Sequence, residues 1–213
     1  MIHVFDNNIK VFDSHLLPLQ RNRYKNNNLH EPIEEKWFLK AIKKTKGSFV
    51  DIGAGIGYYS MLAKKVKPKL RVIAYEPSQV NFNRMADNIK LNNSTFIEMR
   101  RVAISSKRGT ARFKEGLYGS VLSPKGQNEV SIEKLIDNHE EIGVCKVDVQ
   151  GHEYEVLKGS DGCKVLTWIV GTHGPGLHKK CLHWLSKRHK IIYQSHSVPG
   201  QPDGLIVTQN GSI

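Results

Sequence analysis

The sequence predicts an α/β fold: a mostly parallel sheet with helices on both faces and an antiparallel last strand. β-Branched stretches such as SFVDIG and RVIAYEP alternate with helical stretches between residues 48 and 105. Strands that alternate with helices are joined by right-handed crossovers and therefore run parallel. Near the carboxyl end, only SVPGQP separates IIYQSH from DGLIVTQ. This connection is too short for a helical crossover and favours an antiparallel pair.

The elements follow an amino-terminal segment, residues 1–30, that we expect to be irregular because RNRYKNNNLHEP is polar and rich in turn formers. Pro32 then opens the helix PIEEKWFLKAIKK. The strands expected after it are SFVDIG, RVIAYEP, TFIEMRRVAIS, KVDV, TWIVGTH, IIYQSH and DGLIVTQ. The expected helices are GYYSMLAKKV, SQVNFNRMADNIKLN, SIEKLIDNHEEI, EYEVLK and HKKCLHWLSKRHK. The glycine-punctuated GTARFKEGLYGSVLS indicates a hairpin insertion, placed over residues 104–125.

Length and composition indicate a single soluble domain over residues 1–213. Hydrophobic residues make up 39% and charged residues 24%, and no apolar run approaches the roughly 18 residues that a membrane span requires. The start, MIHVFDNNIK, lacks the order of a secretory signal, so we expect a cytoplasmic protein. Cys145, Cys163 and Cys181 have no CxxC spacing, which argues against a disulfide framework and a structural zinc site. The oligomeric state stays open.

The net charge of +12 at pH 7 is spread along the chain rather than held in a tail. Basic residues recur in KWFLKAIKKTK, KKVKPKLR, RRVAISSKR and HKKCLHWLSKRHK. We expect surface or basic-patch positions for His178, His183, His189 and His196. Two interpretations remain open: a solvated face, or a surface that attracts nucleic acid, phosphate or an anionic glycan.

The strongest motif is VDIGAGIGYYS, which puts Gly53, Gly55 and Gly57 in the turn between a strand and its helix. Without side chains there, a ligand can press against the backbone and the helix amino terminus. Asp51 precedes the glycines, and Glu76 ends the next strand, where a carboxylate can accept both hydroxyls of a ribose. An acid just before the first glycine suits a nucleoside cofactor with a cationic end better than NAD.

The ordered series of motifs from about Phe49 to Gly159 resembles the FkbM family of class I S-adenosylmethionine-dependent methyltransferases. It runs VDIGAGIGYYS, AYEPS, DNIKLNN, VAIS, SIEKLID and KVDVQGHEYEVLKG. The resemblance implies a Rossmann-like sheet with an antiparallel last strand and S-adenosylmethionine as the methyl donor. It also implies an acceptor hydroxyl on a sugar or another small molecule, which could be an anionic glycan.

The positions of this chain that match the family pattern imply which residues form the donor site. The residues implied to line its methionine and ribose side are Asp51, Gly53, Gly55 and Gly57. Glu76 is implied to hold the ribose, and Val102 and Ala103 fall where the adenine is expected. Asn88 and Asn92 are instead expected at the helix surface and cap.

The chain departs from the family pattern at two positions. Family members commonly carry an acid in the turn after the fourth strand, as in DxEG, where this chain has Gln150. Many also carry an acid two residues before the His that ends the fifth strand, where this chain has Gly171. Both departures remove negative charge from the expected cleft and argue against a carboxylate-rich metal site, so we expect no metal.

The stretch KVDVQGHEYEVLKG supplies the candidate catalytic residues. Asp148 ends a strand at the edge of the sheet where ligands bind, beside the expected donor. Methyl transfer to oxygen needs an oriented hydroxyl that loses its proton, and a carboxylate or imidazole can provide both. We therefore expect Asp148 to orient the acceptor and to line the donor site, with His152 and His173 as alternative bases. Glu153 has the alternative role of a helix amino-terminal acid.

Two other functions remain open. A ribose-methylating RNA enzyme would suit the charge, and Asp148 could be the Asp of the Lys-Asp-Lys-Glu set that such enzymes use. However, no Glu follows Glu155, so the late glutamate of that set is missing. The last alternative is a non-catalytic module that keeps the nucleoside-binding fold.

Overall fold

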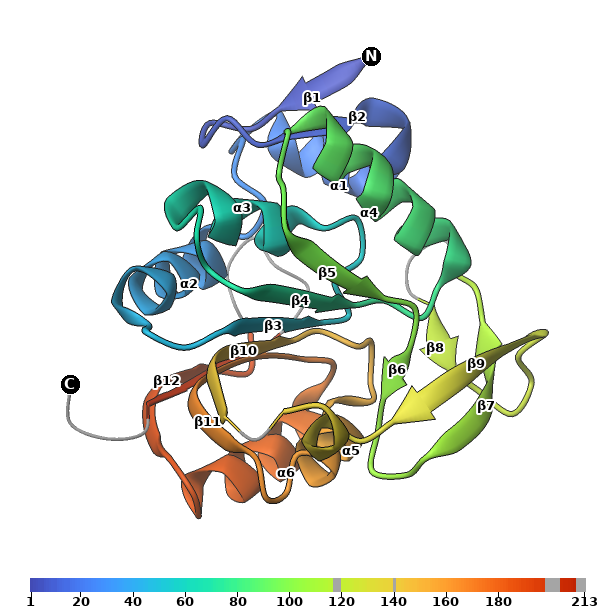
Figure 1. The fold of residues 1–213 in the computed structure, drawn as a ribbon, viewed down its shortest axis with the longest axis vertical. Coiled ribbons are helices and arrows are strands. Elements are labelled where there is room, and N and C mark those ends of the chain that lie inside the picture. The colour runs from blue at the N-terminus through green and yellow to red at the C-terminus, as the bar shows by residue number, and fades with distance from the viewer. Residues whose placement is uncertain (117–119, 140, 198–203, 210–213) are drawn as a thin grey trace.

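The computed structural model describes residues 1–116, 120–139, 141–197 and 204–209. Its centre is a seven-stranded sheet in the order β12-β13-β11-β10-β3-β4-β5 (Figure 1). The strands are β3 (Phe49–Ile52), β4 (Val72–Tyr75), β5 (Ile97–Arg100), β10 (Glu141–Val147), β11 (Lys164–Thr172), β12 (Lys190–Ser195) and β13 (Gly204–Gln209). The sheet is parallel from β5 to β11, whereas β13 runs antiparallel to both of its neighbours. The predicted fold class is confirmed. The connection SVPGQP lies almost wholly outside the described residues.

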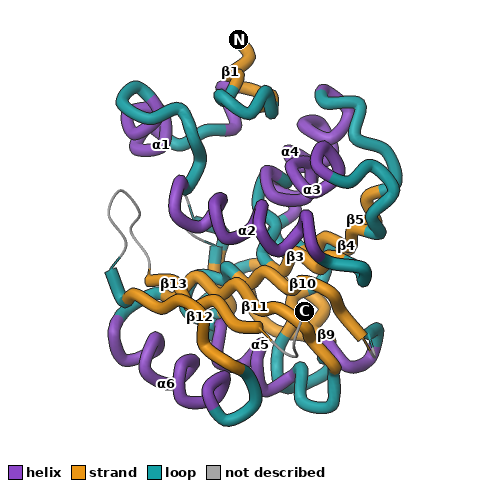
Figure 2. The backbone as a smooth tube through the Cα atoms, turned by 90° about the vertical axis from the view of Figure 1, so that its left-hand side faces the viewer, coloured by secondary structure: helices purple, strands orange, loops and turns teal. Residues whose placement is uncertain are grey.

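Helices cover both faces of this sheet, as Figure 2 shows with the sheet nearly edge-on. The helices are α2 (Pro32–Lys44), α3 (Tyr58–Val66), α4 (Gln79–Leu91), α5 (Glu153–Gly159) and α6 (Pro175–Ser186). Successive strand residues point to opposite faces, so Phe49 packs with the α2 and α3 side while Val50 packs with the α5 and α6 side. No helix in the described part of the chain is both long and apolar enough to cross a membrane.

The amino-terminal segment is ordered, which contradicts our expectation of an irregular residues 1–30. It contains β1 (Ile2–Val4), β2 (Lys10–Phe12), the 3-10 turn η1 (Asp13–His15) and α1 (Pro18–Tyr24). Its apolar residues, among them Phe5 and Val11, join the core on the α3 side. Asn88 of α4 accepts a hydrogen bond from the Phe12 backbone N–H at 3.1 Å and is fully buried, so our placement of Asn88 on the helix surface was wrong. Asn92 is the cap of α4, as expected.

The stretch after β5 forms a second, four-stranded sheet in the order β6-β9-β7-β8. Its strands are β6 (Ala103–Ile104), β7 (Gly109–Lys114), β8 (Val121–Leu122) and β9 (Asn128–Glu133). The expected hairpin corresponds to β7 and β8, which pair antiparallel, while residues 117–119 lie outside the described part. The helix expected in SIEKLIDNHEEI is wrong: its start belongs to β9, the 3-10 turn η2 (Leu135–Asp137) follows, and its last two residues begin β10. This small sheet lies beyond the carboxyl ends of β3, β4 and β5 (Figure 1).

Candidate functional site

A cavity of about 900 Å³ lies at the carboxyl ends of the parallel strands. Gly53, Glu76, Asp148 and His173 each follow the last residue of β3, β4, β10 and β11, respectively, and all line this cavity. Because these strands are neighbours and parallel, their carboxyl ends meet at one edge, which is where ligands bind in open α/β sheets. The small sheet and the amino-terminal segment supply further walls.

The glycine loop comes into direct contact with the strand end that carries Asp148. Gly53 has a φ of 78°, and a Cβ atom there would stand 1.9 Å from the Asp148 carbonyl oxygen. Only glycine fits this approach. Asp51 lies just below the loop, where it is buried and accepts a hydrogen bond from the Ser60 hydroxyl at 2.7 Å. Burial raises the pKa of Asp51, against the opposing charge of Lys146 and the bond from Ser60.

Glu76 places a buried carboxylate next to the glycine loop. Its Oε2 accepts a hydrogen bond from the Gly55 N–H at 2.8 Å, and its Oε1 accepts one from the Ser78 N–H at 2.9 Å. Burial raises the pKa of Glu76 to about 7, although both hydrogen bonds oppose the shift. Val102 and Ala103, at the start of the small sheet, line the same cavity. The open space around the Gly55 α-carbon leaves room for a ligand against this carboxylate.

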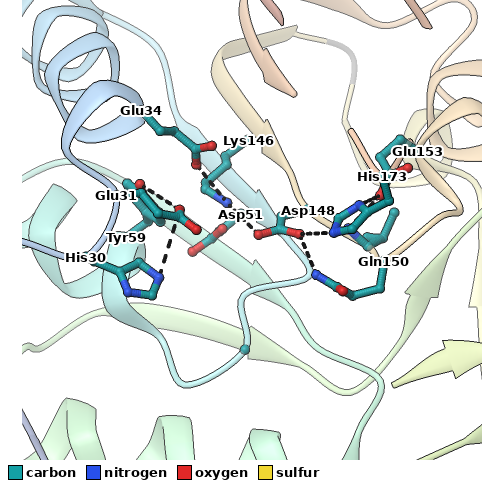
Figure 3. Close-up of polar contacts among 12 residues, drawn as sticks. His30, Glu31, Glu34, Asp51, Tyr59, Lys146, Asp148, Gln150, Glu153 and His173 are labelled. Carbon is teal, nitrogen blue, oxygen red and sulfur yellow. Dashed lines mark hydrogen bonds and ion pairs between the residues drawn. The ribbon is translucent and has the colours of Figure 1, made fainter. Parts of the chain in front are cut away.

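Asp148 lies at the centre of a charged row (Figure 3). Its Oδ2 is 3.5 Å from the Lys146 ammonium nitrogen, which also lies 3.1 Å from Glu34 Oε1. Lys146 is buried and sits 4.6 Å from the centre of the Tyr59 ring. Burial alone would raise the pKa of Asp148, but the charge of Lys146, the charge that His173 carries when it is protonated, and a hydrogen bond from Gln150 outweigh it and lower that pKa. Asp148 is therefore ionised at neutral pH.

His173 faces Asp148 from the end of β11. Its Nε2 lies 3.8 Å from Asp148 Oδ1, and its Nδ1–H donates to Glu153 Oε1 at 2.8 Å. Glu153 is fully buried and also accepts from the Gly151 N–H at 2.9 Å. A carboxylate on Nδ1 fixes the tautomer and ring orientation of a histidine and leaves Nε2 as the acceptor. Glu153 is therefore an acid in the first turn of α5, and the same carboxylate also holds His173.

His152 lies in a different part of the cavity. It precedes α5, and its Nε2 is 2.9 Å from the Ser105 hydroxyl at the end of β6. Burial lowers the pKa of His152. The structure thus brings Asp148 and His173 together and places His152 toward the small sheet.

Both departures from the family pattern act on Asp148. Gln150 donates from its side-chain nitrogen to Asp148 Oδ1 at 3.1 Å, a bond that an ionised glutamate cannot give. A Cβ on Gly171 would lie 3.8 Å from Asp148 Cγ, so an acid there would set a second carboxylate beside the first. Like charges raise the pKa of a carboxylate. Both departures therefore favour an ionised Asp148. In the described part of the chain, no group of three His, Cys, Asp or Glu residues is placed to hold a metal ion.

Several site residues were missed by sequence reasoning. Lys146 stands two residues before Asp148 in a buried strand, and this alternation could have identified it as facing the same edge. His30 and Arg23 line the cavity and Glu34 contacts Lys146, but all three precede the first strand of the motif series, where no spacing rule predicts these contacts. The placement of His178 was also wrong: it is buried and lies 2.8 Å from the Thr172 hydroxyl.

The order of the strands, the glycine loop after β3 and the acidic residue Glu76 after β4 are together typical of the class I, Rossmann-like methyltransferases. A family model described as the methyltransferase FkbM domain matches residues 51–199. This range is more than half of the chain, and the chain therefore belongs to the FkbM methyltransferase family. S-Adenosylmethionine is the methyl donor of this family, so the predicted family and donor are both confirmed.

Similar proteins agree with this placement. The chain is 27% identical over 154 residues to a methyltransferase, sdnD, of Sordaria araneosa, covering 53% of this chain and 60% of that one. It is 33% identical over 122 residues to the hexuronic acid methyltransferase AglP of Haloferax volcanii, and this match covers 51% of this chain and 48% of that one. The chain thus spans about half the length of the curated relatives it matches. The structure of an FkbM methyltransferase from Methylobacillus flagellatus KT superposes with a TM-score of 0.57 at 15% sequence identity. The superposition covers 77% of this chain and 43% of that one, and it supports the fold.

Proposed function

We propose that this chain is an O-methyltransferase that uses S-adenosylmethionine to methylate a hydroxyl on a sugar or another small molecule. The observation that carries this proposal is one cavity with two kinds of carboxylate. Glu76 is buried beside the glycine loop, and the ionised Asp148 faces His173 on the neighbouring strand ends. The Glu76 carboxylate is suited to binding the nucleoside of the donor, and the Asp148 carboxylate is suited to binding the hydroxyl of the acceptor.

The residues present fit the donor. Glu76 offers its carboxylate to the ribose hydroxyls, Val102 and Ala103 offer an apolar wall to the adenine, and Asp51 supplies negative charge below the glycine loop. Gly55 keeps this part of the wall free of a side chain, whereas the Cβ positions of Gly53 and Gly57 point at Asp148 and Met85. When bound, S-adenosylmethionine supplies an electrophilic methyl group on a positively charged sulfur.

Asp148 and His173 would handle the acceptor. Asp148 accepts a hydrogen bond from the acceptor hydroxyl, orients it and takes part in removing its proton. A carboxylate with a lowered pKa holds a hydrogen bond better than it keeps a proton. His173 has Nε2 toward Asp148 and Nδ1–H on Glu153, so it can take the proton onward as an imidazolium that Glu153 stabilises. His152 remains the alternative base.

A sugar acceptor has independent support. The relative from Haloferax volcanii is named a hexuronic acid methyltransferase, and that protein is 33% identical to this chain over 122 residues. The net charge of +12 also suits an acidic acceptor, although RNA would be attracted by the same charge.

Transfer of a labelled methyl group to a panel of neutral sugars, acidic sugars, transfer RNA and capped RNA tests the proposal. We expect mass spectrometry to find an alkali-stable methyl ether on a sugar. Transfer to RNA alone would show that the basic surface defines the substrate. No transfer to any acceptor, together with no binding of S-adenosylhomocysteine, would favour the non-catalytic module.

We expect Glu76→Ala to weaken S-adenosylhomocysteine binding by about 1 to 3 kcal/mol, because charged hydrogen bonds to the ribose are lost. Because the pKa of Glu76 is raised to about 7, the affinity for S-adenosylhomocysteine should also depend on pH. Ribose hydroxyls donate to the ionised carboxylate, so affinity should rise about tenfold between pH 6 and pH 8. Calorimetry across this range should show the rise in the wild type and a flat profile in Glu76→Gln. Equal slopes in both proteins would contradict the assignment.

A further inference from the structure

Arg23 is a cavity-lining arginine at the end of α1 that forms no ion pair in the described part of the chain. Its Nη2 donates a long hydrogen bond of 3.4 Å to the hydroxyl of the neighbouring Tyr24. Its Nε is buried and has no hydrogen-bond partner among the described residues. A buried donor without a partner costs stability, and a guanidinium has five donors. The apoprotein therefore leaves most of the binding capacity of Arg23 unused.

Arg23 lies on the side of the cavity that carries His30, because its Nη2 contacts the Tyr24 hydroxyl, which in turn contacts His30. From His30, contacts run through Glu31 and Tyr59 to Lys146, the neighbour of Asp148. The charge of Arg23 acts on His30, and the charges of Lys146 and Asp148 act on the same ring. Burial, together with Arg23 and Lys146, lowers the pKa of His30 to about 3, so His30 is neutral and adds no competing charge. His30 Nδ1 is 2.5 Å from the Tyr24 hydroxyl, which fixes the ring against α1.

The nearby acid is engaged elsewhere. Glu31 accepts a hydrogen bond from the Tyr59 hydroxyl at 3.2 Å and lies 3.9 Å from His30 Nε2. A planar guanidinium binds a carboxylate through two parallel hydrogen bonds, which a lone tyrosine hydroxyl cannot replace. The missing partner of Arg23 therefore has the chemistry of a carboxylate brought by a ligand.

We propose that Arg23 is a carboxylate-binding residue of this cavity, contributed by the amino-terminal segment that precedes the family-matched range. This inference rests on the proposed function, because two participants of that reaction can bring the carboxylate. One source is the methionine end of the donor, and the other is an acidic acceptor such as a uronic acid. Either source would give α1 a role in binding, since Arg23 stands outside residues 51–199.

Calorimetry with two nucleosides tests the donor as the source. S-Adenosylhomocysteine carries the amino-acid carboxylate, whereas 5′-methylthioadenosine keeps the nucleoside and lacks it. If Arg23 holds the donor, Arg23→Gln should weaken binding of the first by about 10- to 100-fold and leave binding of the second unchanged.

Acidic and neutral sugars test the acceptor as the source. Protein saturated with S-adenosylhomocysteine is titrated with glucuronate and with glucose, and binding is followed by nuclear magnetic resonance line broadening. If Arg23 holds the acceptor, the wild type should prefer glucuronate, and Arg23→Gln should lose that preference while its nucleoside affinities stay unchanged.

Matched variants separate this role from general charge and from folding. Lys25→Gln removes a cation from an exposed position directly after the same helix, and it should change none of these affinities. Arg84→Gln removes another cavity-lining arginine, and it should not reproduce the selective loss. Because Arg23 has a buried donor without a partner, Arg23→Gln should not lower the melting temperature of the apoprotein.

The inference and the proposed function fail differently. Wild-type protein that binds neither nucleoside would overturn the proposed function. Wild-type protein that binds S-adenosylhomocysteine, with Arg23→Gln that keeps both its nucleoside affinities and its sugar preference, would overturn the role of Arg23 alone. A lowered melting temperature with equal losses for both nucleosides would instead make Arg23 a structural residue.

Discussion

Asp148→Asn should lower the turnover of methyl transfer by about two to four orders of magnitude and leave donor affinity nearly unchanged. The substitution keeps the shape of the side chain but removes the charge that orients the hydroxyl and draws on its proton. It also leaves Lys146 next to a neutral amide. Turnover is measured with a saturating acceptor from the panel, and donor affinity is measured by calorimetry on the same protein. Near-wild-type turnover would reduce Asp148 to a structural end of β10.

Histidine variants show where the proton goes. His173 lies 3.8 Å from Asp148, whereas His152 lies against Ser105. We therefore expect a large loss of turnover in His173→Ala and a small one in His152→Ala. Glu153→Gln should shift the pH profile of turnover, because it changes the partner of His173 Nδ1. A large loss confined to His152→Ala would move the base to the small-sheet side of the cavity. Rescue of activity by an added metal ion would instead indicate that Asp148 and His173 bind a metal together.

Lys146→Met should lower the free energy of unfolding by about 3 to 5 kcal/mol, because removing one partner leaves buried charge without compensation. Lys146 is the cation between Glu34 and Asp148, and its own pKa is raised by these acids, with burial opposing them. Urea denaturation measures the loss. Lys146→Met combined with Glu34→Leu should recover part of it. A loss below about 1 kcal/mol in the single variant would contradict the central place of Lys146.

The same variant should change how stability depends on pH. In the wild type the pKa of Asp148 is lowered, so Asp148 contributes stability above its unfolded pKa that is lost only in acid. Without Lys146, burial raises that pKa, and the folded state then binds more protons than the unfolded chain. Stability of Lys146→Met should therefore fall more steeply than that of the wild type as pH rises from 5 to 8, because burial raises the pKa of Glu34 to about 8 and that of Glu76 to about 7 and so already gives the wild type part of this slope. An unchanged pH profile would show that Lys146 does not control Asp148.

Local sequence patterns predicted the central sheet because apolar residues recur with a different spacing in strands and in helices. β3, α3, β4 and α4 follow the expected boundaries within a few residues, and the antiparallel pair followed from the length of one connection. SIEKLIDNHEEI was mistaken for a helix because its apolar residues suit both periods. There, pairing with β7 outweighs local propensity and makes β9 a strand.

The site was predictable where topology alone determines it. Glu76, Asp148 and His173 each follow a parallel strand, and the carboxyl ends of such strands meet at one edge. His30 and Arg23 reach the cavity through packing of the amino-terminal segment, which depends on tertiary contacts of Phe5 and its neighbours rather than on any motif. Such contacts have no local signature in the sequence.

An experimental structure with S-adenosylhomocysteine bound tests the central claim most directly. We predict the ligand in the cavity, with its ribose hydroxyls on Glu76, its adenine beside Val102 and Ala103, and its sulfur on the side of Asp148. A ligand bound outside this cavity, or a ribose that does not contact Glu76, would contradict the proposed arrangement of donor and acceptor.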